Sequence, residues 1–302
     1  MRRSETRAPR VYVVIPVHNR RDMTLGCLAC LAVQTFPALS VVVVDDGSSD
    51  GTAAAIRAQY QNVEIIRGDG SLWWTGATNL GVLWCLQRAQ SSDYVLTLND
   101  DTTMDPEYVA RLVATGAAAP DALIGSTLVD GRDGQTVIAA GTRMQWFTAG
   151  ARDLGRGGTL EELQCARVLV HEVDLLCGRG TLIPIAVFRR IGLYDSRRLP
   201  QNAADHEFSR RAARAGFRLY VDHGAVVFNV DHSGSRSAVE SYSTARRIIW
   251  KLTSRKSPLH PWYHLVYALR TCPWYALPTY FVGYYTRVVL AMAQRRIRER
   301  VG

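Results

Sequence analysis

The sequence predicts an α/β protein whose mostly parallel, twisted sheet is flanked by helices. Two β-branched runs, Val11–Pro16 and Ser40–Val44, are almost continuously apolar, as in strands that are buried on both faces of a parallel sheet. Each run is followed by a segment with helical periodicity, and this alternation is typical of βαβ units. The chain has 302 residues, of which 47% are hydrophobic and 21% charged, so a sizeable core is expected.

The first hundred residues continue this alternation. We expect helices at Asp22–Gln34, Ala53–Tyr60 and Thr75–Gln90, and further strands at Val63–Arg67 and Tyr94–Leu98. Neither G-x-G-x-x-G nor G-x-x-x-x-G-K-[ST] occurs in this part of the sequence. The pattern therefore predicts a nucleotide-binding half that is neither a dinucleotide-binding fold nor a P-loop fold.

The second half of the chain differs from the first. Its expected elements are a hairpin of Ala122–Val129 with Thr136–Gly141, strands at Val168–Leu176, Gly180–Ile183 and Phe217–Phe228, and helices from Pro184 to Gly192, at Ala203–Ala215 and at Val239–Ser254. The segment Thr148–Thr159 is rich in Gly and Arg, and we expect a mobile loop there. We divide the chain into a domain over 1–240, with halves at 11–103 and 104–240, and a helical extension over 241–302.

Two adjacent acids follow the fourth expected strand. Asp100 and Asp101 come directly after the apolar run Tyr94–Leu98 and Asn99, and such carboxylates need water, a cation or several donors. Ligands bind at the carboxyl edge of open α/β sheets, and a divalent cation that holds phosphate oxygens suits this position. The alternative is a polar turn before a helix cap, but Asp105-Pro106-Glu107 is already expected to supply that cap.

Four motifs occur in order along the chain: Y-V-V-I-P-V-H-N-R at 12–20, V-V-D-D-G-S-S-D-G-T at 43–52, G-A-T-N-L-G at 76–81 and L-N-D-D at 98–101. Together they resemble the inverting nucleotide-sugar glycosyltransferases of family 2, which have the GT-A (Rossmann-like) fold. The run D-G-S-L-W-W-T-G-A-T-N at 69–79 is similar to that of the rhamnosyltransferase-like members. The resemblance covers most of residues 11–235 and none of the chain after 240.

This resemblance implies a sugar donor carried on a nucleoside diphosphate, and Mg²⁺ or Mn²⁺ to stabilise the leaving diphosphate. Asp101 would contact the metal directly, and Asp100 would hold ribose, water or metal. Asn99 stands where an acid is common in the D-x-D-like motif of the family, so the number of protein ligands stays open. His232 resembles the histidine that completes the metal shell, and the alternative is a surface histidine.

The resemblance also implies a nucleotide-binding edge. Asp46 matches the acid that hydrogen-bonds the pyrimidine base, whereas Asp45 is expected to be structural. Pro16, His18 and Asn19 would place backbone atoms near the base, although Asn19 is equally suited to form the turn after the strand.

The loop at 68–79 would, by the same resemblance, pass beside the nucleoside and the donor sugar. Its binding residues would be Gly70, Trp73, Trp74 and Asn79. The two indoles would stack on the donor or fill the core, and the sequence leaves both alternatives open.

Inversion by direct displacement needs one general base on the acceptor hydroxyl and no nucleophile from the enzyme. Asp205 matches the base of the family at the start of an expected helix. The alternative is an acid that the N-terminal helix dipole stabilises. Glu207 faces another direction and is expected to anchor the loop, and His206 is expected to be structural.

The C-terminal extension carries the positive charge of the chain. Residues 243–302 contain eleven Lys and Arg and one acid, whereas the whole chain has a net charge of +9. Aromatic residues are concentrated at 258–293, next to Arg295, Arg296, Arg298 and Arg300. This composition suits a helix in a membrane interface over anionic lipid, and the alternative is a contact with the domain or with a second subunit in a homodimer. Nucleic acid is not expected, because these Arg residues flank apolar runs.

The N-terminus and the cysteines favour a cytoplasmic protein that lies peripherally on the inner face of the cell membrane. No apolar stretch long enough for a signal peptide follows the basic segment Met1–Arg10. The six cysteines lie mostly in apolar segments, and Cys27 and Cys30 lack a second pair for a zinc site, so reduced thiols are expected.

We therefore expect an inverting, metal-dependent hexosyltransferase that acts on a glycan or lipid-linked acceptor in cell-surface polysaccharide synthesis. Motif similarity favours dTDP-rhamnose as the donor. The alternatives are a galactosyl or hexosyl transferase that uses a UDP-sugar, and a non-catalytic protein that binds nucleotide or glycan on the same fold. The five residues Asp46, Asp100, Asp101, Asp205 and His232 occur together, which favours the enzyme.

Overall fold

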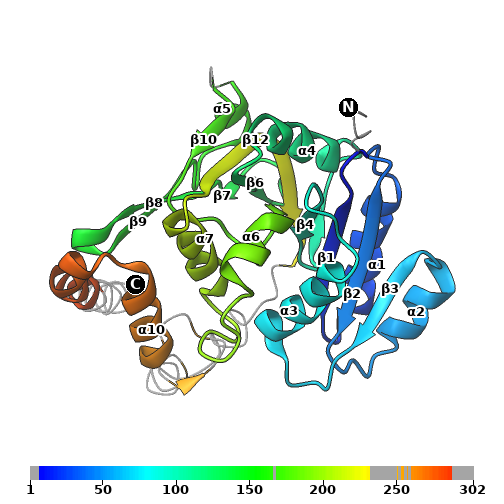
Figure 1. Cartoon of the computed structure of the whole chain (residues 1–302), viewed down its shortest axis with the longest axis horizontal. Helices are drawn as coiled ribbons and strands as arrows, with labels where there is room; N and C mark the ends of the chain where they lie inside the picture. The colour runs from blue at the N-terminus through cyan, green and yellow to red at the C-terminus, as the bar shows by residue number, and fades with distance from the viewer. Residues whose placement is uncertain are drawn as a thin grey trace, which may run out of the picture.

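A computed structural model describes residues 7–165, 168–231, 250, 253–254, 257 and 260–287. These residues form a ten-stranded mixed sheet with helices on both faces, and a two-stranded ribbon and C-terminal helices at one end (Figure 1). The strand order is β10-β12-β6-β11-β4-β1-β2-β3, with β5 paired to β12 and β7 paired to β6. The predicted α/β class is confirmed.

Four parallel strands form the N-terminal half of the sheet. β1 (Val11–Val17) lies between β2 (Leu39–Asp45) and β4 (Tyr94–Thr97), and β3 (Val63–Arg67) forms the edge beside β2. Because these strands run in the same direction, their carboxyl ends meet at one edge of the sheet. The polar segments that follow β1, β2 and β4 are thereby brought together.

The other half of the sheet is joined to the first through an antiparallel strand. β11 (Thr181–Pro184) pairs antiparallel with both β4 and β6 (Ala122–Asp130), and β12 (Arg218–Asn229) runs parallel to β6. The shorter strands are β5 (Thr102–Thr103), β7 (Val137–Ala139) and β10 (Val170–Glu172). The predicted hairpin is present as the antiparallel pair β6 and β7.

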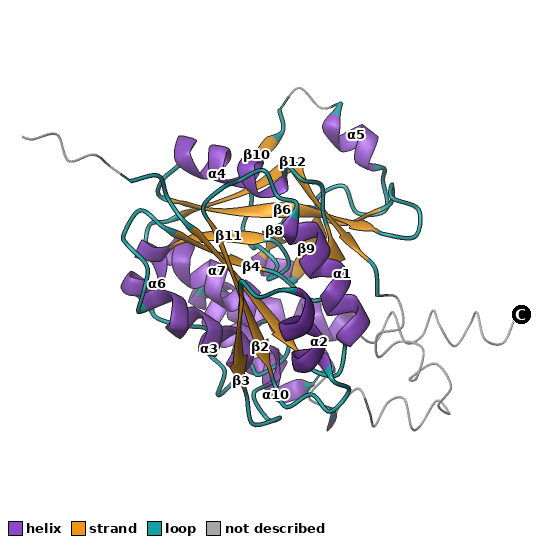
Figure 2. Cartoon of the chain, turned by 90° about the vertical axis from the view of Figure 1, so that its right-hand side faces the viewer, coloured by secondary structure: helices purple, strands orange, loops and turns teal. Residues whose placement is uncertain are grey.

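Helices cover both faces of the sheet (Figure 2). On one face pack α1 (Arg21–Ala32), α2 (Thr52–Gln59) and α4 (Tyr108–Ala118), and on the other pack α3 (Trp73–Leu86), α6 (Ile185–Ile191) and α7 (Ala204–Arg214). Along β1, Val11, Val13 and Ile15 enter one core and Tyr12 and Val14 enter the other. This alternation explains why every position of the strand is apolar.

Two local expectations are wrong. The segment expected as a mobile loop contains β9 (Gly150–Asp153), which pairs with β8 (Thr142–Gln145). Thr159 then caps α5 (Leu160–Gln164) in a capping box with Glu162, so backbone pairing and capping order this Gly- and Arg-rich stretch. The expected cap of α4 is also not formed, because α4 begins at Tyr108 and no side chain caps its N-terminus.

The C-terminal helices pack against the β8–β9 ribbon and α7, at the end of the molecule opposite α2 (Figure 1). α10 (Pro261–Thr271) and a helix over 277–287 contribute Ala268 and Tyr280 to a small core with Met144 of the ribbon. Within the described residues, none of the helices is both long enough and apolar enough to span a bilayer. Most of the helix expected at 239–254, and the arginines Arg295, Arg296, Arg298 and Arg300, lie outside the described residues.

Candidate active site

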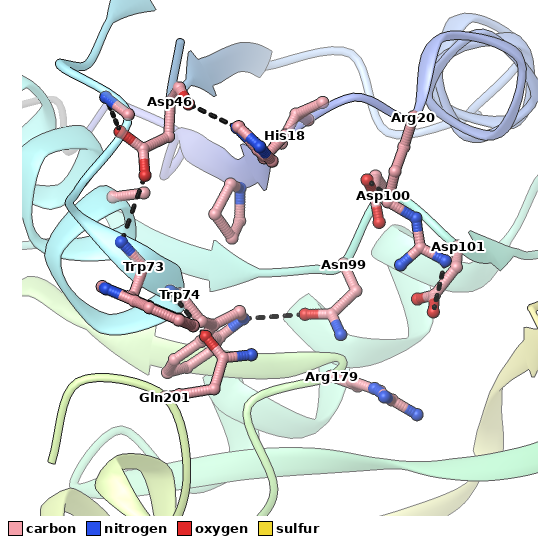
Figure 3. A pocket seen from close by; sticks show the side chains of 14 residues that line it. His18, Arg20, Asp46, Trp73, Trp74, Asn99, Asp100, Asp101, Arg179 and Gln201 are labelled. Carbon is pink, nitrogen blue, oxygen red and sulfur yellow. Dashed lines mark hydrogen bonds and ion pairs between the residues drawn. The ribbon is translucent and has the colours of Figure 1, made fainter. Parts of the chain in front are cut away.

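A pocket of about 390 Å³ lies at the carboxyl edge of β1, β2 and β4 (Figure 3). Its lining includes nine of the residues predicted from the sequence: Pro16, His18, Asp46, Gly70, Trp73, Trp74, Asn99, Asp100 and Asp101. Val17, Arg20, Ala77, Arg179 and Gln201 complete the lining. The structure therefore brings these nine residues together in space, although they are spread over eighty-odd positions of the sequence.

Asp46 organises the loop that carries the two tryptophans. Its Oδ1 accepts a hydrogen bond from the backbone N–H of Gly70 at 2.8 Å, and its Oδ2 accepts from those of Leu72 at 3.0 Å and Trp73 at 3.1 Å. A carboxylate that receives three backbone donors fixes the shape of the segment that supplies them. An ionised carboxylate oxygen has room for a second donor, so Oδ1 can still bind a ligand.

Glycines allow this loop to approach the end of β2. A Cβ at Gly68 would lie 2.6 Å from Asp46 Oδ1, and a Cβ at Gly47 would lie 2.9 Å from the Cα of Gly70. Trp73 itself adopts a left-handed backbone with φ of 56°. This unusual conformation for a large residue is held by the hydrogen bond from its N–H to Asp46.

The turn after β1 is locked to the turn after β2. The Nδ1 of His18 lies 2.6 Å from the backbone carbonyl oxygen of Asp46. Asn19 has a left-handed φ of 53° and does not line the pocket, and its Oδ1 accepts from the backbone N–H of Ser49 at 2.8 Å. Asn19 thus has the turn-forming role that the sequence left open. Asp45, which was expected to be structural, accepts a hydrogen bond from the Ser48 N–H at 2.9 Å in the turn after β2.

Trp74 connects three walls of the pocket. Its indole Nε1 donates to Asn99 Oδ1 at 2.9 Å, and its backbone N–H donates to Gln201 Oε1 at 3.1 Å. Its ring also contacts Tyr194 edge-on, with centroids 5.7 Å apart. The indole therefore packs on the core, one of the two alternatives left open from the sequence, and it also lines the pocket, so stacking on the donor stays a prediction.

Asp100 and Asp101 face Arg20 from the neighbouring strand end (Figure 3). The Nε of Arg20 lies 3.6 Å from Asp100 Oδ2, and its Nη2 lies 3.7 Å from Asp101 Oδ2 and contacts Asp231. Both acids of the pair are almost fully buried. Burial raises the pKa of Asp100 to about 7, against the opposing effect of Arg20, and Asp101 and Asp231 add to the rise.

These residues fit a divalent cation. Asp101 Oδ1 is buried and has no hydrogen-bond partner in the described part of the structure, and a carboxylate oxygen in that state needs a cation or a donor. Among the described residues, no three His, Cys, Asp or Glu side chains are arranged to hold a metal by themselves. A metal here would therefore take further oxygens from water or phosphate, as Mg²⁺ commonly does. His232, the other predicted ligand, lies outside the described residues.

Asp205 lies behind the pocket rather than in its wall. Its Oδ2 accepts from the Gly178 N–H at 2.8 Å, and its Oδ1 accepts from the His206 N–H at 2.9 Å in the first turn of α7. A Cβ at Gly178 would lie 2.5 Å from the Trp74 ring and 3.5 Å from the Cβ of Asp205. The Gly178 backbone thus connects the predicted base to the indole that faces the pocket.

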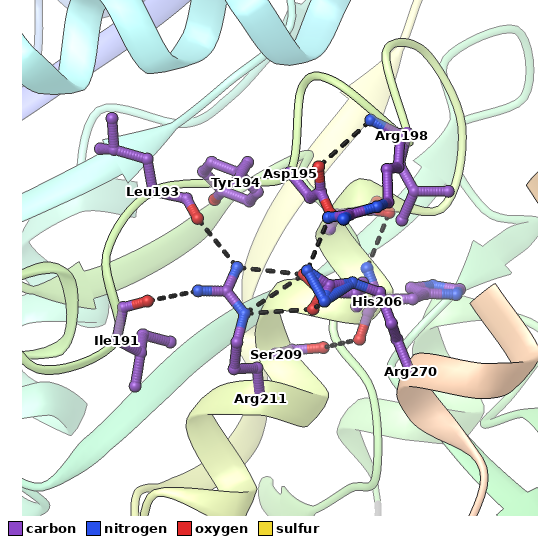
Figure 4. Close-up of polar contacts among 12 residues, drawn as sticks. Ile191, Leu193, Tyr194, Asp195, Arg198, His206, Ser209, Arg211 and Arg270 are labelled. Carbon is purple, nitrogen blue, oxygen red and sulfur yellow. Dashed lines mark hydrogen bonds and ion pairs between the residues drawn. The ribbon is translucent and has the colours of Figure 1, made fainter. Parts of the chain in front are cut away.

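Glu207 anchors the segment around Asp205, as expected, through ion pairs with Arg211 and Arg270, both labelled in Figure 4. Its buried carboxylate pairs with Arg211 at 3.0 Å, and the same guanidinium donates to the carbonyl oxygen of Leu193 at 2.8 Å. Arg270 of α10 lies 3.6 Å from Glu207 Oε1 and 2.8 Å from Asp195 Oδ2. α7, α10 and the segment before α7 are joined by this network.

The structure does not bring Asn79 to the pocket. Its side chain is buried, donates to the carbonyl oxygen of Tyr194 at 2.9 Å and accepts from the Tyr194 N–H at 3.0 Å. Both hydrogen-bonding ends of the amide are used in fastening α3 to the segment after α6. The structure therefore gives Asn79 a packing role in place of the predicted contact with the donor.

Three polar lining residues were not assigned a role from the sequence. Arg20 had a detectable signal, because it ends the same motif as His18 and Asn19 at a strand end. Arg179 donates to Asn229 Oδ1 at 3.2 Å, and Gln201 reaches the pocket because the Thr75 N–H bonds to the carbonyl oxygen of Pro200 at 3.0 Å. These contacts involve segments that lie about a hundred residues or more after the first strands, so a local sequence pattern could not predict that Arg179 and Gln201 line the pocket.

The sequence matches the model of one protein family. The model of the family Glycosyl transferase family 2 matches residues 12–172. The chain is 32% identical over 224 residues to Glycosyltransferase AglE of Haloferax volcanii, a match that covers 72% of this chain and 66% of that protein. It is 27% identical over 237 residues to an N-acetylglucosaminyltransferase of Azorhizobium caulinodans, covering 72% of this chain and 54% of that protein. The matches thus span about half to two thirds of these curated relatives.

A third relative carries a more specific name. The chain is 24% identical over 224 residues to the N-acetylglucosaminyl-diphospho-decaprenol L-rhamnosyltransferase of Mycobacterium tuberculosis, covering 69% of this chain and 72% of that protein. Among solved structures, the mannosyltransferase PcManGT of Pyrobaculum calidifontis with GDP-Man and Mn²⁺ superposes with a TM-score of 0.56 at 17% identity, covering 98% of this chain and 81% of that one. GalNAc-T7 with UDP, GalNAc and Mn²⁺ gives a TM-score of 0.58 at 16% identity, covering 74% and 43%. These likenesses show the GT-A fold.

Proposed function

Because the chain belongs to glycosyl transferase family 2, we propose that it transfers a sugar from a nucleoside-diphosphate donor to a hydroxyl of a glycan or lipid-linked acceptor. One observation carries the proposal. A buried acidic pair, one carboxylate oxygen of which has no hydrogen-bond partner among the described residues, lines the same pocket as a loop held by Asp46, at the carboxyl edge of the sheet. That arrangement supplies a place for a cation with phosphate and a place for a base and sugar beside it.

The nucleoside would lie along the Asp46 side of the pocket. Asp46 Oδ1 accepts only one of the three backbone hydrogen bonds to this carboxylate, so it can accept a further one from a pyrimidine N–H. Pro16 and His18 line the same side. The His18 contact with the Asp46 backbone keeps this edge in place, which limits the entropy lost when the nucleotide binds.

The diphosphate would lie on the Asp101 side. Asp101 would hold Mg²⁺ or Mn²⁺ together with phosphate oxygens, and Asp100 would bind ribose, water or the metal. The cation would supply charge neutralisation for the leaving diphosphate. Arg179, in the same lining, adds a guanidinium whose planar donors suit phosphate oxygens.

Asp205 would act as the general base in an inverting displacement. A base must come within hydrogen-bonding reach of the acceptor hydroxyl, and Asp205 does not line the pocket but is bonded to Gly178, which packs against the Trp74 ring of the lining. We therefore propose that acceptor binding moves the Gly178 segment. The proton of the acceptor hydroxyl would pass to Asp205 while the oxygen forms the new glycosidic bond and the diphosphate leaves.

The identity of the donor is proposed from similarity. The D-G-S-L-W-W-T-G-A-T-N run and the mycobacterial L-rhamnosyltransferase relative support dTDP-rhamnose, and UDP-hexoses are the alternative. The test is a donor screen that measures release of nucleoside diphosphate with and without Mn²⁺. Release from dTDP-rhamnose above that from UDP-hexoses is expected. Tight nucleotide binding with no release from any donor would point to a non-catalytic binding protein.

The acceptor would be presented at a membrane surface. The C-terminal helices expose Trp274 at 82%, Val282 at 69%, Tyr275 at 58% and Tyr285 at 54%. Aromatic side chains of this kind favour the interface between lipid and water. We propose that this face lies on the cytoplasmic leaflet and that the active site is thereby held near a lipid-linked acceptor, and a homodimer through the same face is the alternative.

A further inference from the structure

We infer that Arg20 is a resident cation that neutralises the acidic cluster when no metal is bound and yields its place to the metal. The inference rests on the proposed metal-dependent function and adds to it a role for a residue of this chain. Arg20 would then turn toward the diphosphate, so that the metal ion replaces the guanidinium beside the same carboxylates. Three observations support this role.

The first observation is the position of the guanidinium. Arg20 precedes α1, and its backbone carbonyl oxygen accepts from the Thr24 N–H at 3.0 Å, so its main chain is fixed. From there the side chain extends to Asp100, Asp101 and Asp231, which come from the ends of two other strands. The guanidinium thus lies where three acidic side chains face one another.

The second observation is the burial of these acids. The side chains of Asp100, Asp101 and Asp231 are 6%, 5% and 7% exposed. Buried carboxylates are tolerated only when a cation or hydrogen-bond donors accompany them. Among the described residues, Arg20 is the cationic side chain that forms ion pairs with all three acids.

The third observation is the incomplete fit of Arg20 to Asp100 and Asp101, although the same guanidinium donates a hydrogen bond to Asp231. Its distances to Asp100 and Asp101, 3.6 Å and 3.7 Å, are longer than those of a close guanidinium–carboxylate hydrogen bond. Asp101 Oδ1 is left without a hydrogen-bond partner in the described structure. The guanidinium therefore balances charge without saturating the ligand oxygens, and a divalent ion can replace it.

Arg20 is also well placed to act after the exchange. Its side chain is 30% exposed and lines the pocket that would receive the diphosphate. A guanidinium released from carboxylates can bind phosphate oxygens through its planar donors. Arg20 would thus connect metal binding to donor binding through a single side chain.

The test measures Mn²⁺ binding by the full-length protein without nucleotide, by titration calorimetry and by electron paramagnetic resonance of free Mn²⁺. Arg20→Gln removes the competing charge, so its Mn²⁺ affinity should rise roughly tenfold or more over wild type, because buried ion pairs are strongly affected by loss of one partner. Arg21→Gln is the matched control, since the neighbouring Arg21 pairs with exposed Asp22. Its Mn²⁺ affinity should equal that of wild type.

Thermal unfolding gives a second measurement that needs no turnover. Without metal, Arg20→Gln should melt below wild type, because the buried acids have lost their cation, and Mn²⁺ should restore more of the melting temperature in the variant than in wild type. Arg20→Lys, which keeps a positive charge, should have a melting temperature between those of wild type and Arg20→Gln.

The outcomes separate this inference from the proposed function. Equal or weaker Mn²⁺ binding by Arg20→Gln, with clear binding by wild type, would overturn the role of Arg20 and leave the metal proposal standing. Absence of Mn²⁺ binding by wild type even with nucleoside diphosphate would overturn both. If Arg20→Gln does not fold, Arg20→Met, which also removes the charge and keeps much of the side-chain volume, takes its place, and Mn²⁺ binding no tighter than that of wild type overturns the inference.

Discussion

The indole Nε1 of Trp74 donates a 2.9 Å hydrogen bond to the Oδ1 of Asn99. This bond joins the first turn of α3 to the end of β4, and it orients the Asn99 amide beside the two acids that follow it. The indole N–H only donates, so an acid at this position could accept the same bond, whereas the Asn99 amide accepts it without placing a further negative charge beside Asp100. The Asn99 side chain therefore belongs to the architecture of the Trp74 loop as well as to the acidic motif.

Trp74→Phe tests this bond while keeping an aromatic ring in place. Loss of one neutral hydrogen bond is worth about 0.5–1.5 kcal/mol, so nucleotide affinity should fall by about 2- to 10-fold. Isothermal titration with nucleoside diphosphate and Mn²⁺ measures the change. Trp84→Phe, on the same helix but outside the pocket lining, should leave affinity unchanged. Equal affinities for wild type and Trp74→Phe would show that the bond does not shape the site.

Asp101→Asn tests the proposed metal ligand, because it preserves shape and removes the charge. Loss of the charge stabilisation of the leaving diphosphate should raise the barrier by on the order of several kcal/mol, and excess EDTA on wild type should have the same effect. Asp121→Asn is the control, since this carboxylate is exposed and pairs with Arg218. Full activity in excess EDTA would refute the metal proposal and leave the fold unaffected.

Asp205→Asn tests the proposed base. Removal of general-base assistance should lower turnover by about 10²- to 10⁴-fold while donor affinity stays near that of wild type. Glu161→Gln removes another acid from the first turn of a helix, α5, and should leave turnover unchanged. A variant that loses nucleotide affinity but keeps near-normal turnover at saturation would contradict the assignment and favour a structural helix-terminal acid.

Sequence pattern predicted the N-terminal half of the sheet well, for a physical reason. A strand such as β1 is buried on both faces, so every position must be apolar, and the polar residues of the site can only follow where the strand ends. The positions of Pro16, His18, Asp46 and Asp101 in one pocket follow from that rule and the parallel topology.

The rest of the site depends on contacts that no local pattern encodes. Gln201 is held at the pocket by bonds between the segment at 199–200 and Thr75 and by its own bond to the Trp74 N–H, and Asn79 turns inward because Tyr194 offers both a donor and an acceptor. The position of Asp205 behind Gly178 depends on the packing of the Trp74 ring. Such arrangements are set by tertiary contacts between distant segments, whereas periodicity reports only on local structure.

The exposed C-terminal aromatic face should bind lipid. Replacing Trp274 and Tyr285, which are 82% and 54% exposed, with Ser should weaken partitioning onto anionic vesicles, since each buried apolar side chain contributes to interfacial binding. Vesicle co-sedimentation of full-length protein measures this. Val33→Ser removes an exposed apolar residue at the end of α1 and should change nothing. Equal partitioning of wild type and the double variant, together with a stable dimer in solution, would favour the homodimer alternative.

Acid should loosen the C-terminal helices through His264. Burial lowers the pKa of His264 to about 4, and its ring stacks on Tyr284 with centroids 3.5 Å apart. In the unfolded chain a histidine titrates near 6.5, so the unfolded state binds more protons between these values. Stability from neutral His264 is fully present above about pH 6.5 and is lost as the pH falls toward 4.

The measurement is hydrogen exchange of α10 between pH 7 and pH 4.5, corrected for the intrinsic pH dependence of exchange. Protection should decrease in wild type more than in His264→Phe, which keeps an aromatic ring but does not titrate. Parallel loss of protection in both proteins would assign the effect to other groups, such as His223, whose pKa burial also lowers to about 4.

The ion pairs of Arg270 have a consequence for how this chain can be recombined with its relatives. The guanidinium comes from α10, yet its partners Asp195 and Glu207 lie on either side of the predicted base, Asp205, along the chain. A chimera whose C-terminal helices lack this arginine would leave the buried Glu207 with its ion pair to Arg211 and without the one to Arg270. Functional exchange of the two parts therefore requires that the arginine and both acids be transferred together, so inheritance of the C-terminal helices is tied to the segment at 195–207 that includes Asp205.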